Sequence, residues 1–157
     1  MVEKVVKVFT IIARIRALIL VSGIILLAGC NDEVPQDQIP LTAFDDIFIN
    51  LDLPEFNDLS FDNSFITLPQ GVRGIILYRL NSTTFFAFER NCTFLPNEAG
   101  STVNVDQSRL FMRDTSCGST FGFDGGIPTS GPAQVPLRRY RVIQLGRTLT
   151  ITDEIIN

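Results

Sequence analysis

Histidine and tryptophan are absent from this chain of 157 residues, and cysteine (3), methionine (2) and tyrosine (2) are scarce. Without histidine the chain has no Ser-His-Asp triad, no Cys-His pair and no imidazole ligand for a metal. No motif ties two carboxylates to a shared cleft, and no glycine-rich phosphate loop is present. These absences remove the common catalytic arrangements, so the sequence predicts a protein that is not an enzyme.

The N-terminus has the pattern of a targeting segment. Basic residues at positions 4, 7, 14 and 16 precede an apolar run over residues 17–28, which is short for a membrane span. The run ends in Leu27-Ala28-Gly29-Cys30, which resembles the lipobox of bacterial lipoproteins. This resemblance implies cleavage before Cys30 and attachment of lipid, such as palmitate, to the new N-terminal cysteine. The alternative is a plain signal anchor that leaves Cys30 as an ordinary thiol.

We therefore expect a lipoprotein signal peptide (1–29), a lipid-anchored tether (30–40) and one domain (41–157). Lipid on Cys30 would hold the chain on a bilayer without threading it through. The expected location is the cell envelope, on the periplasmic side or at the outer membrane. Removal of residues 1–29 leaves 9 arginines and no lysine against 16 acidic residues, a net charge of −7. This acidic balance argues against nucleic acid as a partner.

From Leu41 onward, apolar residues alternate with polar ones, and turn residues recur every eight to twelve positions. This pattern predicts an all-β domain without a convincing helix. An acidic loop between the first two strands reads as a solvated face. The strands expected are 44–51, 64–68, 72–80, 83–90, 109–113, 139–145 and 148–152.

Export would place Cys92 and Cys117 in an oxidising compartment, where disulfides persist. We therefore expect a disulfide between these two residues, closing a loop of about 26 residues and contributing roughly 3 kcal/mol. The alternative is two separate buried thiols.

Residues 117–133 read Cys-Gly-Ser-Thr-Phe-Gly-Phe-Asp-Gly-Gly-Ile-Pro-Thr-Ser-Gly-Pro-Ala, followed by Pro136-Leu137. This segment resembles the second cluster-binding box of Rieske iron–sulfur proteins, with its Gly-Ser-x-Phe, its Asp-Gly turn and its proline loop. The resemblance extends over most of the mature domain. It implies a Rieske-like all-β fold of small antiparallel sheets with two loops that face each other.

The ligand positions of the resemblance are degenerate. A Rieske [2Fe–2S] centre takes two cysteines on one iron and two histidines on the other, from Cys-x-His and Cys-x-x-His motifs. Here the first motif reads Cys92-Thr93-Phe94, and the second runs from Asp114 to Cys117, with aspartate in the cysteine position and cysteine in the histidine position. We expect no cofactor, and we expect Phe94 and the disulfide to replace the cluster. A bare ion at Cys92, Asp114 and Cys117 would lack the four ligands of a structural zinc site, so no metal is predicted.

These patterns predict a membrane-anchored, Rieske-like lipoprotein that acts as a non-catalytic binding or structural module for an unidentified envelope protein. Arg138, Arg139 and Arg141 are the candidate partner-binding residues; the alternative is that they are solvated residues of an edge strand. Two redox alternatives stay open for the function. One is electron transfer through a [2Fe–2S] cluster, and the other is a thiol–disulfide module built on Cys92 and Cys117.

Overall fold

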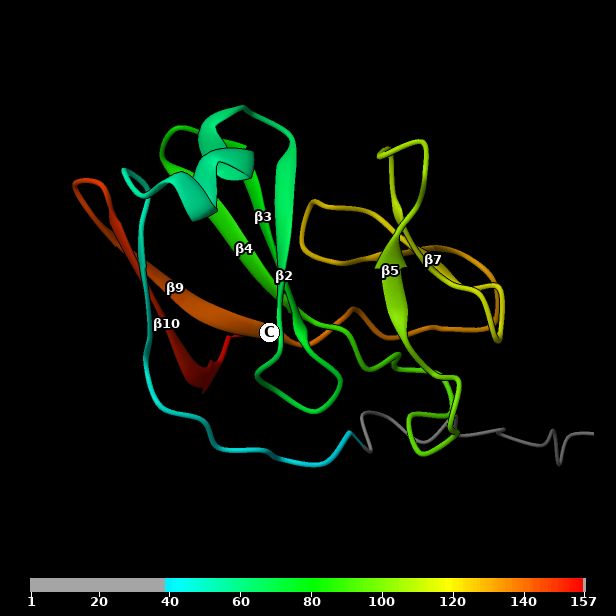
Figure 1. Ribbon diagram of the computed structural model, residues 1–157. Helices are drawn as coiled ribbons and strands as arrows, with labels where there is room; N and C mark the ends of the chain where they lie inside the picture. The colour runs from blue at the N-terminus through cyan, green and yellow to red at the C-terminus, as the bar shows by residue number, and fades with distance from the viewer. Residues whose placement is uncertain (1–38, 157) are drawn as a thin grey trace, which may run out of the picture. The chain divides into compact units, whose positions relative to one another are not determined.

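The computed structural model describes residues 39–156, which form two antiparallel β-sheets (Figure 1). The described residues all belong to one compact unit. The predicted signal peptide, Cys30 and most of the predicted tether lie outside the described residues. In the part of the chain that is described, none of the helices is long and apolar enough to cross a membrane.

The larger sheet has six strands, in the order β1-β10-β9-β4-β3-β2, and every neighbouring pair is antiparallel. Two hairpins, β3-β4 and β9-β10, form its centre, and the short strands β1 and β2 are its edges. The bounds are β1 (Ile47–Asn50), β2 (Ser64–Leu68), β3 (Ile75–Asn81), β4 (Thr84–Glu89), β9 (Arg139–Leu145) and β10 (Thr148–Ile155).

Strand β3 shows why the larger sheet has apolar residues on both faces. Successive side chains of a strand point to opposite faces. Ile75 and Leu77 therefore pack into one core, with residues of β1, β4, β9 and β10, whereas Ile76 and Tyr78 pack into a second core. All four side chains are buried. An uninterrupted apolar run thus becomes a strand that is covered on both sides.

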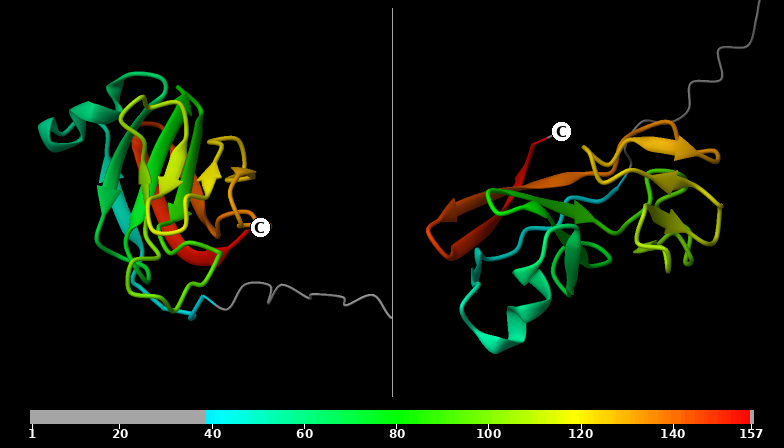
Figure 2. Two further views of the ribbon diagram at one scale, coloured as in Figure 1. Left: turned by 90° about the vertical axis from the view of Figure 1, so that its right-hand side faces the viewer. Right: turned by 90° about the horizontal axis from the view of Figure 1, so that it is seen from above.

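The smaller sheet covers that second core. It has four strands in sequence order, and Figure 2 shows it at one end of the larger sheet. Val103, Met112 and Phe121 are fully buried against the second core, and the ring of Phe123 stacks on that of Tyr78 with centroids 4.0 Å apart. The bounds are β5 (Val103–Val105), β6 (Met112–Asp114), β7 (Thr120–Phe121) and β8 (Pro128–Ser130).

The predicted fold class is confirmed: the domain is all-β, its sheets are antiparallel, and two loops face each other. Strands β2 and β9 have the predicted bounds. The prediction of no helix was wrong for the acidic loop, which contains a 3-10 helix, η1 (Pro54–Ser60), whose Leu59 is buried in the first core. Strand β5 was not predicted. Strand β6 begins three residues after the predicted start at position 109, because a turn with positive φ at Arg109 precedes it.

Candidate functional site

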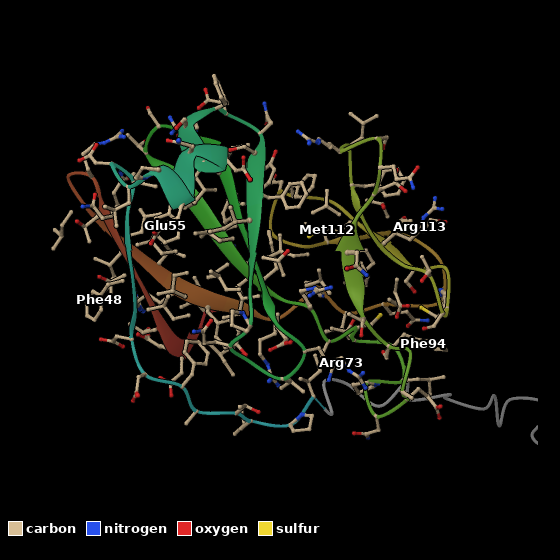
Figure 3. All side chains as sticks on the ribbon, in the orientation of Figure 1. Phe48, Glu55, Arg73, Phe94, Met112 and Arg113 are labelled. Carbon is tan, nitrogen blue, oxygen red and sulfur yellow. The ribbon has the colours of Figure 1, made fainter. Side chains whose placement is uncertain are left out.

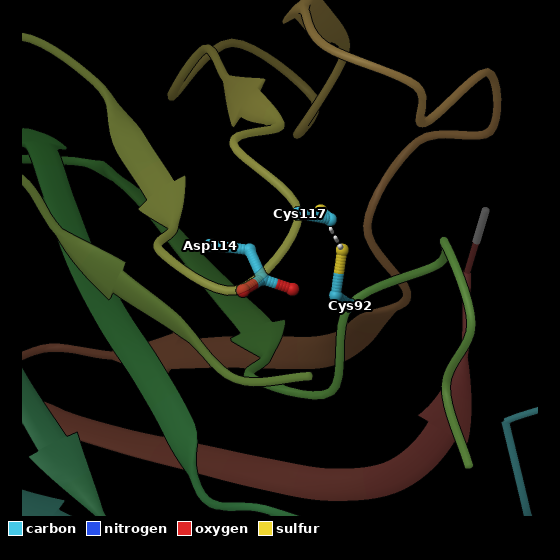
Figure 4. Close-up of side chains that lie close together, drawn as sticks. All are labelled: Cys92, Asp114 and Cys117. Atoms are coloured by element: carbon cyan, nitrogen blue, oxygen red, sulfur yellow. Dashed lines mark hydrogen bonds between the residues drawn. The ribbon is translucent and has the colours of Figure 1, made fainter. Parts of the chain in front are cut away.

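Two loops bring three candidate ligands together. The first loop (residues 90–102) connects β4 to β5 and carries Cys92. The second loop (residues 115–119) connects β6, which ends at Asp114, to β7 and carries Cys117. The Sγ atoms of Cys92 and Cys117 are 4.0 Å apart, and both sulfurs and a carboxylate oxygen of Asp114 lie within 4.8 Å of one another. In Figure 4 a dashed line joins Cys92 and Cys117, and one Asp114 oxygen points toward Cys92. Sequence reasoning named all three residues, and the fold brings them to one place.

Both cysteines are free thiols in the structure, so the expected disulfide is not formed there. A disulfide holds its sulfurs about 2.05 Å apart, so closure needs about 2 Å of approach. The pairing stays a prediction.

The surroundings of Cys92 hold its thiol in the protonated form. Burial raises the pKa of Cys92 far above its ordinary value, and a backbone hydrogen bond at Phe94 lowers it by less. The neighbouring Asp114 carboxylate and the Cys117 thiol raise it further. Reactive cysteines have depressed pKa values and partial exposure. Cys92 therefore differs from a typical redox-active nucleophile.

Hydrogen bonds within the turn set the position of Cys117. The backbone N–H of Ser119 donates to Cys117 Sγ at 3.4 Å, and the thiol donates to Ser119 Oγ at 3.0 Å. The same Ser119 Oγ accepts the N–H of Ala133 from the proline loop. The turn itself closes through the Asp114 N–H, which donates to the Ser119 carbonyl, and the Gly118 N–H, which donates to the Asp114 carbonyl. The position of the Cys117 sulfur is therefore fixed by its bonds to Ser119 and by the closed backbone turn.

Asp114 is fully buried, and its two oxygens differ. Oδ1 accepts hydrogen bonds from the backbone N–H and the hydroxyl of Ser116, at 2.8 and 2.7 Å. Oδ2 is buried without any hydrogen-bond partner, and none of the ion pairs among the described residues includes this carboxylate. A buried carboxylate oxygen without a partner is costly, so this atom is the least satisfied feature of the site.

Arg73 holds the first loop in place, a role that no sequence pattern indicates. Its guanidinium donates to the carbonyls of Ala99 and Glu98, at 2.9 and 2.6 Å, and more weakly to that of Pro96 at 3.3 Å. It also donates to Oδ1 of Asn91. Figure 3 shows Arg73 beside the loop that carries Phe94. Because these contacts lie 18 to 26 residues away along the chain, no local pattern could have indicated them.

Glu89 is a second residue that sequence reasoning missed. Its buried carboxylate accepts the backbone N–H groups of Val72, Arg73 and Asn91, and the hydroxyl of Tyr140. These bonds join the segment before β3 to the start of the first loop, and both to the larger sheet. The carboxylate of Glu89 therefore positions three backbone N–H groups and the Tyr140 hydroxyl.

Phe94 is half-buried and packs against the second core, to which Cys92 and Cys117 also belong. Its placement agrees with the expectation that an aromatic side chain lies near the ligand positions. The idea that it replaces part of a cluster stays a prediction.

The predicted partner-binding arginines need a correction. Arg138 is only 2% exposed, and its guanidinium donates to the carbonyls of Ile39 and Pro40, so it is not a surface contact. Arg139 donates to the carbonyl of Ile156 and lies near the Phe86 ring. Arg141 is exposed and pairs with Glu154. The alternative was wrong in calling the strand an edge, because β9 lies between β10 and β4, but Arg141 is exposed to solvent, as that alternative expects.

A Rieske [2Fe–2S] cluster does not fit this donor set. Such a cluster needs four protein ligands, two on each iron. In the described part of the chain the grouped donors are Cys92, Asp114 and Cys117, and no histidine exists anywhere in the sequence to supply the imidazoles. Three donors leave at least one iron without its protein pair.

No protein-family model matches this chain, and no curated protein matches it. Among solved structures, it is similar to a chain of the "Complex of reduced oxygenase and oxidized ferredoxin in carbazole 1,9a-dioxygenase". That match has 18% identity and a TM-score of 0.45, and covers 61% of this chain and 86% of that one. The all-β architecture described above rests on the strand pairing of this chain itself.

Proposed function

We propose that this chain is a lipid-anchored, Rieske-like domain that has lost its [2Fe–2S] ligands and serves as a non-catalytic binding or structural module of the cell envelope. The lipid anchor rests on the lipobox-like sequence that ends at Cys30. The Rieske-like assignment rests on the segment from Cys117 to Leu137. The proposed partner is another envelope protein, and Arg139 and Arg141 on β9 stay as candidate contacts.

One observation carries the proposal: the loops at the ligand positions are held by bonds within the protein. Arg73 binds three carbonyls of the first loop. Ser119 links the second loop to the proline loop, and Thr93 Oγ1 donates to the Val135 carbonyl at 2.7 Å, which links the first loop to the same segment. The protein's own groups therefore tie these three segments to one another, which supports a scaffold that keeps its shape after losing the ligands.

The test is the visible absorption spectrum and the iron content of the protein, purified without oxygen from cells supplied with iron. The proposal expects a folded, colourless protein without stoichiometric iron. A brown protein with two irons per chain would overturn it, and electron transfer would become the leading function.

A second candidate is a thiol–disulfide redox module, favoured by the 4.0 Å separation of the two sulfurs. The raised pKa of Cys92 argues against it, because the thiolate is the attacking species in disulfide exchange. Alkylation rates at neutral pH separate the two. A redox module expects fast labelling of one cysteine in the folded protein, whereas a structural pair expects labelling that becomes fast only after unfolding.

A further inference from the structure

We propose that Cys92, Cys117 and Asp114 form a binding site for a single thiophilic divalent cation, of which Zn²⁺ is the representative case. The proposal goes beyond the proposed function, which needs no metal. It departs from the sequence-based expectation of no metal because the separation of the three donors became visible only in the fold.

The distances suit one ion. With a Zn–S bond of about 2.3 Å and tetrahedral angles, two thiolates on one ion lie about 3.8 Å apart. The observed separation between the Cys92 and Cys117 sulfurs is 4.0 Å. A carboxylate oxygen on the same ion would lie about 3.6 Å from each sulfur, and all three donor atoms here are within 4.8 Å of one another. The site therefore needs only a small movement of the Asp114 carboxylate.

The unpaired oxygen of Asp114 is evidence for a bound cation that does not depend on the distances between the donors. Oδ2 is buried without a hydrogen-bond partner, on a residue that is 0% exposed. A neutral disulfide between the cysteines would offer this oxygen neither a donor nor a positive charge. A divalent cation bound to both sulfurs would satisfy it directly.

The groups around the three donors are arranged as supports for metal ligands. The Ser119 N–H donates to the Cys117 sulfur, and Ser116 donates twice to the other oxygen of Asp114, which leaves Oδ2 as the free oxygen. Such outer hydrogen bonds orient ligands and hold their charge. Cys92 and Asp114 are buried, and Cys117 is half-buried, so the site is reached from solvent on the side of Cys117.

The binding step balances in protons and charge. Each thiol releases its proton to solvent, and the cation loses waters as it gains two thiolates and one carboxylate oxygen. Oxidation of the two thiols to a disulfide would remove both sulfur ligands. Metal binding and the predicted disulfide therefore exclude each other, and the bound ion should protect the thiols from oxidation.

The test uses the full-length chain with Cys30→Ser, which leaves Cys92 and Cys117 as its only thiols, reduced and purified in detergent without oxygen. Co²⁺ is titrated as a spectroscopic probe, and Zn²⁺ is then titrated against a chromophoric chelator. We expect one ion per chain, with thiolate-to-Co²⁺ charge-transfer bands and the intense visible bands of tetrahedral coordination, both removed by Zn²⁺.

Variants separate the ligands from their surroundings. Cys117→Ser should weaken Zn²⁺ binding by about 100-fold or more, and Asp114→Asn by about 10-fold, the scale seen when metal-site groups are removed. The matched control is Asp124→Asn, an exposed carboxylate beyond β7, which should leave the affinity unchanged. Should the buried Asp114→Asn variant fail to fold, the half-buried Cys117 still provides a test through Cys117→Ala, with folding checked by circular dichroism.

The inference is overturned if the reduced protein binds Zn²⁺ no more tightly than the Cys92→Ser, Cys117→Ser double variant, or if Co²⁺ gives no thiolate bands. That result leaves the proposed scaffold function standing. Two irons and sulfide per chain would overturn both proposals, so the two failures are distinguishable.

Discussion

The two sheets of this molecule are stabilised in different ways. The larger sheet has strands of four to eight residues, and alternation along them fills the first core with side chains such as Ile49, Leu77 and Leu149. The smaller sheet has strands of only two or three residues. Its loops depend on hydrogen bonds from individual side chains, among them Arg73, Thr93 and Ser119.

This contrast indicates which region of the molecule can change the chemistry of a site. A region fixed by regular apolar packing tolerates few polar substitutions, because burial supplies most of its stability. Loops fixed by a few directed bonds can lose or exchange ligands while those bonds remain. The candidate site lies in the second kind of region, next to a rigid sheet that holds its ends.

The largest effect is expected from the larger sheet. Leu77→Ala removes a fully buried side chain of β3 from the first core, and should lower the free energy of unfolding by about 3 kcal/mol, through lost burial and a residual cavity. Chemical denaturation measures this as a lower midpoint at an unchanged slope. The control Leu80→Ala, at a 36% exposed position of the same strand, should cost less than about 1 kcal/mol. Equal costs would contradict the assignment of the first core.

Two glycine substitutions, at Gly131 and Gly118, test the packing of the loops beside the smaller sheet. At Gly131 (φ +88°) an added Cβ would meet Ser119 Cα at 2.5 Å, so Gly131→Ala adds a backbone clash to the strain of positive φ. We expect a loss of about 2 to 3 kcal/mol.

The matched control for this pair is Gly118→Ala. Gly118 has a similar φ of +78°, but nothing lies within 4 Å of an added Cβ. This variant should lose only about 1 kcal/mol, from backbone strain alone. Equal losses in a denaturation series would mean that the proline loop is not packed against the turn at Ser119.

Arg73 tests the role of directed hydrogen bonds. Arg73→Ala removes the donors to the first loop and should cost about 1 kcal/mol, since its hydrogen bonds to the Asn91 side chain and to the Glu98 and Ala99 carbonyls are lost together. Hydrogen exchange should speed up over residues 96–103 and stay nearly unchanged in β9 and β10. The control Arg141→Ala, whose partner Glu154 is exposed, should change neither stability nor exchange appreciably. Faster exchange throughout the larger sheet would contradict a local role.

The smallest effect is expected from ionisation of the two tyrosines, Tyr78 in the second core and Tyr140 in the first. Burial raises both pKa values above 10.0; for Tyr140 the hydrogen bond to Glu89 and its charge raise the pKa further, while Arg138 lowers it. A phenol with a raised folded pKa stabilises the protein fully below pH 10, and this contribution is lost as the pH rises through the folded pKa.

Ultraviolet absorption of tyrosinate measures this effect directly. The folded protein should contain less tyrosinate at pH 10 than the denatured protein, Tyr78 should ionise before Tyr140 at higher pH, and both should ionise near pH 10 in denaturant. Ionisation of either phenol near pH 10 in the folded protein would contradict its burial.

Much of the larger sheet was predictable because its signal is local. In residues 139–145 polar and apolar residues mostly alternate, and the turn at Gly146 has the composition of a hairpin. Residues 64–68 are a short, mostly apolar run between Asn63 and Pro69, so the bounds of both strands follow from short segments. Strands β5 and β7 could not be predicted in this way. With three and two residues they have too few positions to show a period, and they form because β6 lies between them.

The chemistry available to the site can be read from the residue types alone: two thiols beyond Cys30, a nearby aspartate and no imidazole anywhere. Which of these groups meet depends on the packing of the folded chain. It joined Cys92 to Cys117 across 25 residues, left one oxygen of Asp114 without a partner, and buried Arg138, which the sequence had placed on the surface. The physical reason is that composition is carried by each residue alone, whereas contacts between distant residues are fixed by how the two sheets pack.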